Sequence, residues 1–146
     1  MGAGSTEVEA IVGRLGLTQG DIVGEMGYDE DVDHDLRDAV ADFTGEELID
    51  LDDQSIDQVV DAGLLWWRDA DGDLTDALVD SLTLLADDGA ILLISPKTGR
   101  DGYVESSDIS EAAQTAGMSQ TTSVGGTQDW MITRLSRPRA PRQPRH

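Results

Sequence analysis

The residues best suited to chemistry in this sequence are aspartates, and one group of them is Asp69, Asp71 and Asp73. They alternate with small residues, as the ligands of a calcium-binding EF-hand loop do. That loop needs glycine at its sixth position and glutamate at its twelfth, where this chain has Leu74 and Asp80. The run is therefore interpreted as a polar turn in which Asp73 caps the next helix.

A second acidic run covers residues 29–35 and contains His34, the one histidine outside the C-terminal end. Alternating aspartates in a loop are usually solvated, although they could bind a hard cation weakly. No serine or cysteine nucleophile pattern accompanies His34, so a catalytic role is not indicated. The chain has no cysteine, which excludes disulfides and thiolate ligands. No metal site and no catalytic residue are predicted.

A third group of candidates is the loop of Ser95, Pro96, Lys97 and Arg100, which follows an apolar run at residues 90–94. Open α/β sheets bind ligands at the carboxyl ends of their strands, so this loop is a candidate for contact with a ligand or partner. Lys97 is the sole lysine and could hold a carboxylate or phosphate. The alternative is an ordinary solvated loop cation.

The elements that position these residues are organised around residues 56–99. Two uncharged apolar runs, residues 62–67 and 90–94, flank a stretch whose leucines recur at helical spacing: Leu74, Leu78, Leu82 and Leu85. This pattern predicts a strand, a crossover helix and a parallel strand. Strands that are continuously apolar are usually covered on both faces. We expect a compact three-layer Rossmann-like α/β sheet, mostly parallel.

The flanking sequence predicts the other elements. Before the central unit we expect a helix that Ser5 or Thr6 caps and Gly16 ends, a strand at 21–28, a helix at 35–43 and a short strand at 47–51. The 35–43 helix would be capped by Asp33 or Asp35 and bury Leu36, Ala39, Val40 and Phe43. After the unit, Asp108 should cap a short helix that Gly117 stops. Strands at 121–124 and 130–135, joined around Gly125 and Gly126, should close the sheet as an antiparallel pair.

Trp66 and Trp67 are adjacent on a predicted strand, so their rings should point to opposite faces of the sheet. If helices cover both faces, both rings belong to the core. Otherwise one of them is exposed and marks an interface with a partner.

The charge is strongly uneven. Residues 1–133 hold all thirty acidic and five of the ten basic residues, a formal −25. So acidic a body disfavours nucleic acid and anionic membranes. We expect residues 1–135 to form a single α/β domain and residues 136–146 to be a disordered Arg/Pro-rich tail, which could touch RNA, an acidic partner or the body. No apolar run is long enough for a membrane span, and a cytoplasmic location is expected.

Several segments resemble the actinobacterial family called Domain of Unknown Function 3052. They are LLWWRDADGDLTDALVDSL, ISPKTGRDGYVESSDISEAAQTAGM and the pair DW at 129 and 130, and the resemblance covers about residues 15–135. The family implies no activity.

A remoter resemblance is to the class I methyltransferase fold, in which the first strand ends in an acid and a glycine-rich turn and the second in an acid that holds a ribose. Residues 25–29, EMGYD, resemble the first element and Asp50 the second. The resemblance implies that Glu25, Gly27, Tyr28 and Asp50 would bind S-adenosylmethionine. Where that family has a second glycine, this chain has Tyr28 and Asp29, which should crowd the site.

Three functions follow from these patterns. The leading hypothesis is a non-enzymatic regulatory or adaptor protein on a degenerate methyltransferase-like scaffold, without a cofactor and with a protein as its partner. The alternatives are a methyltransferase that binds S-adenosylmethionine and an acidic mimic of nucleic acid. If the cofactor binds, a bulky residue at Gly27 is expected to abolish binding and leave the fold intact.

Overall fold

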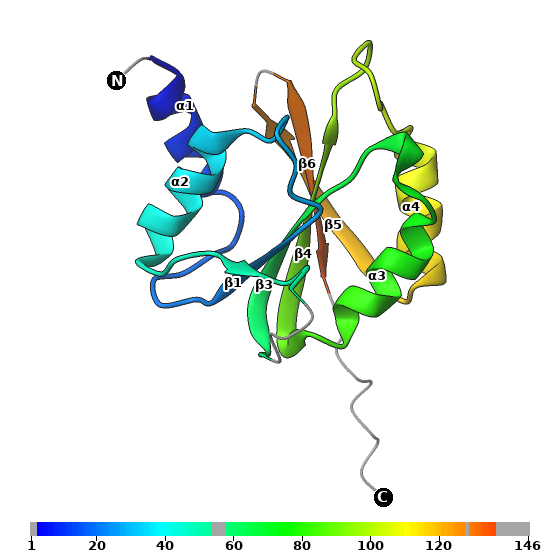
Figure 1. Ribbon diagram of the computed structural model, residues 1–146, viewed down its shortest axis with the longest axis horizontal. Coiled ribbons are helices and arrows are strands. Elements are labelled where there is room, and N and C mark those ends of the chain that lie inside the picture. Colours follow the sequence, from blue (N-terminus) through cyan, green and yellow to red (C-terminus); the bar gives the residue numbers. More distant parts are fainter. Residues whose placement is uncertain (1–2, 54–57, 128, 137–146) are drawn as a thin grey trace, which may run out of the picture.

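The computed structural model describes residues 3–53, 58–127 and 129–136, which form one six-stranded sheet with helices on both faces (Figure 1). The strand order is β2-β1-β3-β4-β6-β5. The strands are β1 (Val23–Met26), β2 (Ile49–Asp50), β3 (Val60–Trp66), β4 (Leu85–Pro96), β5 (Ser119–Gly126) and β6 (Trp130–Ser136). The helices are α1 (Ala3–Val12), α2 (His34–Thr44), α3 (Leu74–Leu82) and α4 (Ser106–Thr115), with a short 3₁₀ turn η1 (Asp69–Asp71).

The sheet is mostly parallel and closes with an antiparallel pair. Strand β1 pairs in parallel with β2 and β3, and β3 pairs in parallel with β4. Strand β6 runs antiparallel to both β4 and β5. The predicted α/β fold class is therefore confirmed. Ser136 ends β6, and the rest of the predicted tail, residues 137–146, lies outside the described residues.

Two apolar layers, one on each face of the sheet, hold the fold together. The first contains side chains of α1, α2 and the facing strand residues, among them Trp66. The second contains α3, α4 and the opposite strand faces, among them Trp67. Trp66 is 0% exposed and Trp67 8%, so the adjacent rings are buried in different layers, as the alternation of side chains along a strand requires.

Helix caps follow the predicted chemistry in α2 and α3. The Asp33 side chain accepts the Leu36 N–H, and Gly45 ends α2 with φ +81°. The Asp73 side chain accepts the Asp76 N–H at the start of α3. Each carboxylate satisfies an amide that the first helical turn leaves without a partner.

The helices differ from the predictions in their boundaries and in one buried face. Ser5 and Thr6 lie inside α1, which begins at Ala3 and ends at Val12 rather than at Gly16. Asp108 lies inside the first turn of α4, because the helix already starts after Glu105. Phe43 is 37% exposed, so the buried stripe of α2 is narrower than the sequence indicates.

Strand boundaries differ as well. Leu85 does not continue α3 but begins β4, where it pairs with Val60. Gly125 and Gly126 belong to β5 rather than to the turn. At Gly126 a Cβ atom would lie 1.9 Å from the Trp130 carbonyl oxygen, so glycine lets β5 approach β6 closely.

The link from β2 to β3 is unusually short. It consists of residues 51–59, and its described parts, 51–53 and 58–59, contain no helix. A crossover between parallel strands usually takes a dozen or more residues and includes a helix that covers the sheet. In the described structure, no crossover helix between β2 and β3 therefore covers β1 and β2 on the face of the sheet where α3 lies.

Candidate functional site

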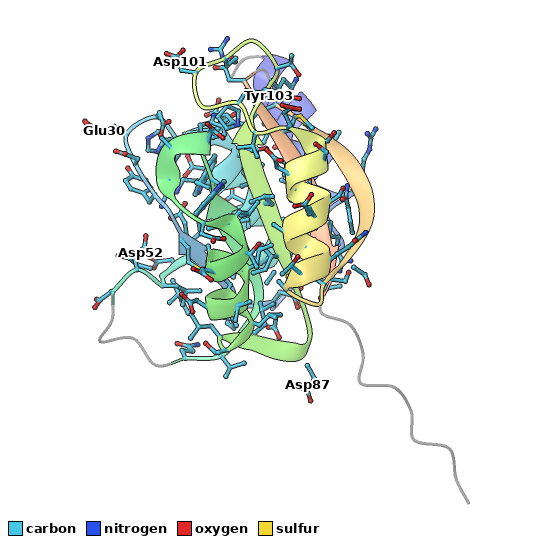
Figure 2. The ribbon with its side chains drawn as sticks, turned by 90° about the vertical axis from the view of Figure 1, so that its right-hand side faces the viewer. Glu30, Asp52, Asp87, Asp101 and Tyr103 are labelled. Carbon is cyan, nitrogen blue, oxygen red and sulfur yellow. The ribbon has the colours of Figure 1, made fainter. Side chains whose placement is uncertain are left out.

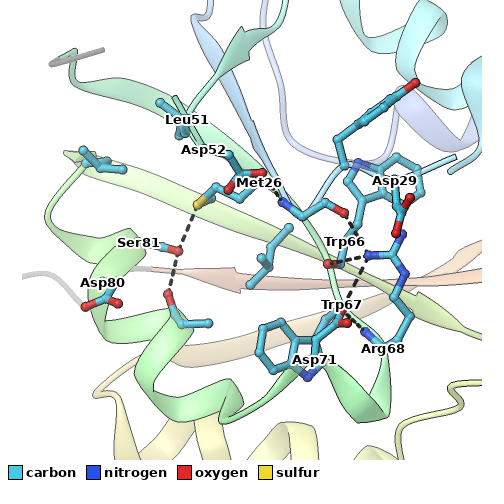
Figure 3. A pocket seen from close by; sticks show the side chains of 15 residues that line it. Met26, Asp29, Leu51, Asp52, Trp66, Trp67, Arg68, Asp71, Asp80 and Ser81 are labelled. Atoms are coloured by element: carbon cyan, nitrogen blue, oxygen red, sulfur yellow. Dashed lines mark hydrogen bonds and ion pairs between the residues drawn. The ribbon is translucent and has the colours of Figure 1, made fainter. Parts of the chain in front are cut away.

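A cavity of about 600 Å³ lies where the carboxyl ends of β1, β2 and β3 meet (Figure 3). The chain passes from β1 to β2 on one side and then returns to β3 on the other, so the strand order reverses at β1. Open α/β sheets bind ligands at such reversals. Its lining comes from the residues that follow these three strands and from one face of α3.

The turn after β1 is held by the protein itself. Gly27 has φ +76°, and a Cβ atom there would lie 2.3 Å from the Trp66 carbonyl oxygen. The Gly27 N–H donates to Asp52 Oδ2 at 2.9 Å, and its carbonyl oxygen accepts from Arg68 Nη1 at 2.8 Å. The expectation that a bulky residue at Gly27 would leave the fold intact is wrong, because that residue would collide with the backbone of β3.

Arg68 connects this turn to the surrounding loops. Its guanidinium also pairs with Asp31 and, at 3.5 Å, with Asp71, and it lies 5.4 Å from the centre of the Trp130 ring. Burial lowers the pKa of Arg68, but the hydrogen bond and charge of Asp31, with the charge of Asp71, outweigh that effect and raise it. Arg68 is thus a permanent cation with acidic partners, of which Figure 3 shows Asp71. Sequence reasoning did not single it out.

Glu25 lies on the other face of the sheet from the α3 side of the cavity. It is 5% exposed, and its carboxylate accepts hydrogen bonds from Arg37 Nε at 2.6 Å, Arg37 Nη2 at 2.8 Å and Trp66 Nε1 at 2.8 Å. The hydrogen bonds that Arg37 donates to Glu25 raise the pKa of Arg37, with burial acting in the opposite direction. The Arg37 guanidinium lies 4.7 Å from the centre of the Tyr28 ring, which is 48% exposed.

The structure thus separates the four residues predicted to bind a cofactor. Gly27 and Tyr28 line the cavity, whereas Glu25 and Asp50 are not among its lining residues. Asp50 instead accepts the Asp52 N–H at 3.0 Å within the turn after β2. The acid that reaches the cavity from this turn is Asp52, two residues further along the chain.

Of the predicted ligand or partner loop, Ser95 and Pro96 belong to β4, which is longer than the sequence indicates, and only Lys97 and Arg100 follow the strand. Pro96 and Arg100 line a different cavity of about 420 Å³. Arg100 pairs with Asp129 at 2.8 Å, and the Lys97 backbone N–H donates to the Asp129 carbonyl oxygen. Ser95 is fully buried, and its hydroxyl has no hydrogen-bond partner in the described structure. The Asp31–Arg68 pair lies between the two cavities, because each of these residues lines one of them.

The first cavity is acidic on an apolar floor. Four carboxylates line it, and Arg68 is the one basic residue among its described lining residues: the acids are Asp29, Asp52, Asp71 and Asp80. Negative charge also surrounds the rest of the molecule, since the labelled Glu30, Asp87 and Asp101 lie at its periphery (Figure 2).

No group of three or more possible metal ligands occurs within the described residues. None of the described helices is long and apolar enough to cross a membrane.

The strand order, the helices on both faces and the cavity at the reversal of the sheet define a Rossmann-like α/β protein of the methyltransferase type of fold. Solved structures agree. The pyocyanin biosynthetic protein PhzM matches with a TM-score of 0.66 at 12% identity over 92% of this chain, and this chain spans 55% of its length. A SAM-dependent methyltransferase from Aquifex aeolicus matches with a TM-score of 0.59 at 13% identity, over 90% of each chain.

The chain belongs to the family described as protein of unknown function DUF3052, whose pattern matches residues 12–139. An uncharacterised protein of Mycobacterium tuberculosis strain H37Rv is 45% identical over 127 residues, which cover 87% of this chain and 78% of the relative. An uncharacterised protein of Mycobacterium bovis matches equally well. The family recognised from the sequence is thus confirmed, and so is the likeness to the methyltransferase fold.

Proposed function

We propose that this protein is a non-enzymatic adaptor that uses a methyltransferase-like fold to bind another protein. The observation that carries the proposal is the state of the Gly27 turn. Its N–H donates to Asp52, its carbonyl oxygen accepts from Arg68, and a Cβ atom at this position would lie 2.3 Å from the Trp66 carbonyl oxygen. A backbone engaged on every side by its own protein offers a nucleoside little to bind.

The surroundings of Glu25 support the same proposal. In the methyltransferase resemblance, Glu25 is the acid that would meet the cofactor. Here its buried carboxylate already receives three hydrogen bonds, two from Arg37 and one from Trp66. A ligand would have to compete with a buried ion pair for this carboxylate.

A second candidate is binding of S-adenosylmethionine, and one observation favours it. The cavity lies at the reversal of the strand order and carries four carboxylates, which suits a cationic ligand. A magnesium protoporphyrin IX methyltransferase from Synechocystis, solved with bound SAM, shares the fold with a TM-score of 0.55 at 14% identity.

Thermal unfolding of the full chain with and without S-adenosylmethionine or S-adenosylhomocysteine separates the two candidates. A ligand at a hundred times its dissociation constant adds about 2.7 kcal/mol, which is about 8 to 14 °C for a chain of this size. We expect no shift at about 1 mM of either compound. A shift of several degrees that a cavity-filling Ala77→Trp substitution removes would establish the second candidate instead.

A further inference from the structure

The cavity at the Gly27 turn continues as a groove along α3. Three of its lining residues on α3, Ala77, Asp80 and Ser81, follow the spacing i, i+3 and i+4, and Leu84 lines it from the turn after the helix. This spacing places one face of α3 along the groove, over about 6 Å. The groove is thus longer than the Gly27 turn alone would make it.

The floor of the groove lies on the sheet face beside α3, over which the described parts of the β2–β3 link place no helix. Met26, Leu51 and Leu65 line it. Met26 and Leu51 are only partly buried, although they pack against the second apolar layer. A helix within a β2–β3 crossover would lie over this floor beside α3, since crossover helices pack on the faces of the sheet.

The charge along the groove indicates what could lie in it. Asp52 approaches from the sheet side and Asp80 from α3, on opposite sides of the apolar floor (Figure 3). Arg68, at the end near the Gly27 turn, is balanced by Asp31 and Asp71. An occupant that matches this surface has an apolar face with positive charges on both sides of it.

We propose that this groove docks a cationic amphipathic helix from a partner protein. The apolar stripe of the helix packs on Met26 and Leu51, the partly buried residues of the floor, and its Lys or Arg side chains pair with Asp52 and Asp80. Recognition of this kind places anchors at i, i+3, i+4 and i+7 into an apolar groove. The inference rests on the proposed adaptor function and names the chemistry of the partner.

The test uses a fluorescently labelled peptide of about 14 residues, roughly four helical turns, with a leucine stripe flanked by lysines. A peptide of the same composition in scrambled order serves as the specificity control. Binding to the full chain is followed by anisotropy at low and at moderate salt. We expect the amphipathic peptide to bind at least about tenfold more tightly than the scrambled one.

Two matched pairs of variants locate the binding. Ala77→Trp fills the groove, whereas Val79→Trp adds the same ring to a position on α3 that is 45% exposed and does not line the groove. Asp80→Asn removes a charge from the groove, and Asp76→Asn removes one from elsewhere on α3. We expect Ala77→Trp to weaken binding at least about tenfold and Asp80→Asn about threefold, with the two controls within about twofold of the native chain. Circular dichroism establishes that each variant is folded.

The outcomes separate this inference from the proposed function. Equal binding of both peptides, or equal loss in Ala77→Trp and Val79→Trp, would mean that the acidic surface attracts any cation, and the groove inference would be refuted. Absence of peptide binding refutes it as well and leaves the adaptor proposal standing if S-adenosylmethionine also fails to bind. A thermal shift with S-adenosylmethionine that Ala77→Trp removes refutes the adaptor proposal itself.

Discussion

Substituting Gly27 by alanine should destabilise the protein far more than a glycine replacement normally does. A non-glycine residue at φ +76° costs about 1 kcal/mol. The new Cβ would also lie 2.3 Å from the Trp66 carbonyl oxygen, so the turn must move away from β3. That movement weakens the hydrogen bonds to Asp52 and Arg68, each worth about 1.5 kcal/mol because one partner is charged.

Backbone strain and the two weakened hydrogen bonds together lower the free energy of unfolding of Gly27→Ala by about 4 kcal/mol, which corresponds to a fall of about 12 to 20 °C in melting temperature. The matched control is Gly20→Ala, because Gly20 has φ +89° and a Cβ atom there would have nothing within 4 Å. This control isolates the backbone strain and should cost only about 1 kcal/mol. Denaturant unfolding of both variants measures the difference. Equal losses for Gly20 and Gly27 would show that close contact with β3 does not decide the role of the turn.

Two further groups of variants test the network around α2. Arg37→Met leaves Glu25 buried with Trp66 as its remaining donor, and it should lower the free energy of unfolding by about 3 kcal/mol. Adding Glu25→Gln to the same chain should restore part of this loss, which a double-mutant cycle measures. Pairing with Glu25 raises the pKa of Arg37, so the stability that Arg37 contributes is fully present below the ordinary pKa of arginine and is lost only at higher pH. The difference in melting temperature between the native and Arg37→Met chains should therefore stay constant from about pH 6 to 9. Asp33→Ala should lower the free energy of unfolding by about 1 kcal/mol and Asp35→Ala by less than half of that, because the Asp33 side chain caps α2. Equal losses in thermal unfolding would contradict this assignment.

Much of the fold was predictable because burial follows simple periods. The central strands read as continuous apolar runs, and both are covered on each face. The end of α3 was not predictable in the same way. Leu85 is buried in the same layer as Leu74 and Leu78, so its hydrophobicity fits a helix and a strand equally well. Only the pairing of Leu85 with Val60 distinguishes the two.

The candidate site was only partly predictable. Gly27 and Tyr28 follow directly from the end of β1, and they line the cavity. Arg68 could not be recognised, because its role depends on Asp31, which lies 37 residues away in the sequence. Similarly, the choice of Asp52 rather than Asp50 depends on the geometry of the turn after β2.

The short β2–β3 link accounts for both unusual features of the site. Its second residue, Asp52, turns back onto the Gly27 N–H and so closes the turn at which a nucleoside would be expected. Its first residue, Leu51, packs on β1 so closely that a Cβ atom at Gly24 would lie 2.3 Å from Leu51 Cδ1. The described parts of the link, residues 51–53 and 58–59, place no helix over the apolar groove beside α3. The same link thus closes the Gly27 turn with Asp52 and lacks, in its described residues, a helix over the groove, which is why we expect the ligand test and the peptide test to give opposite answers.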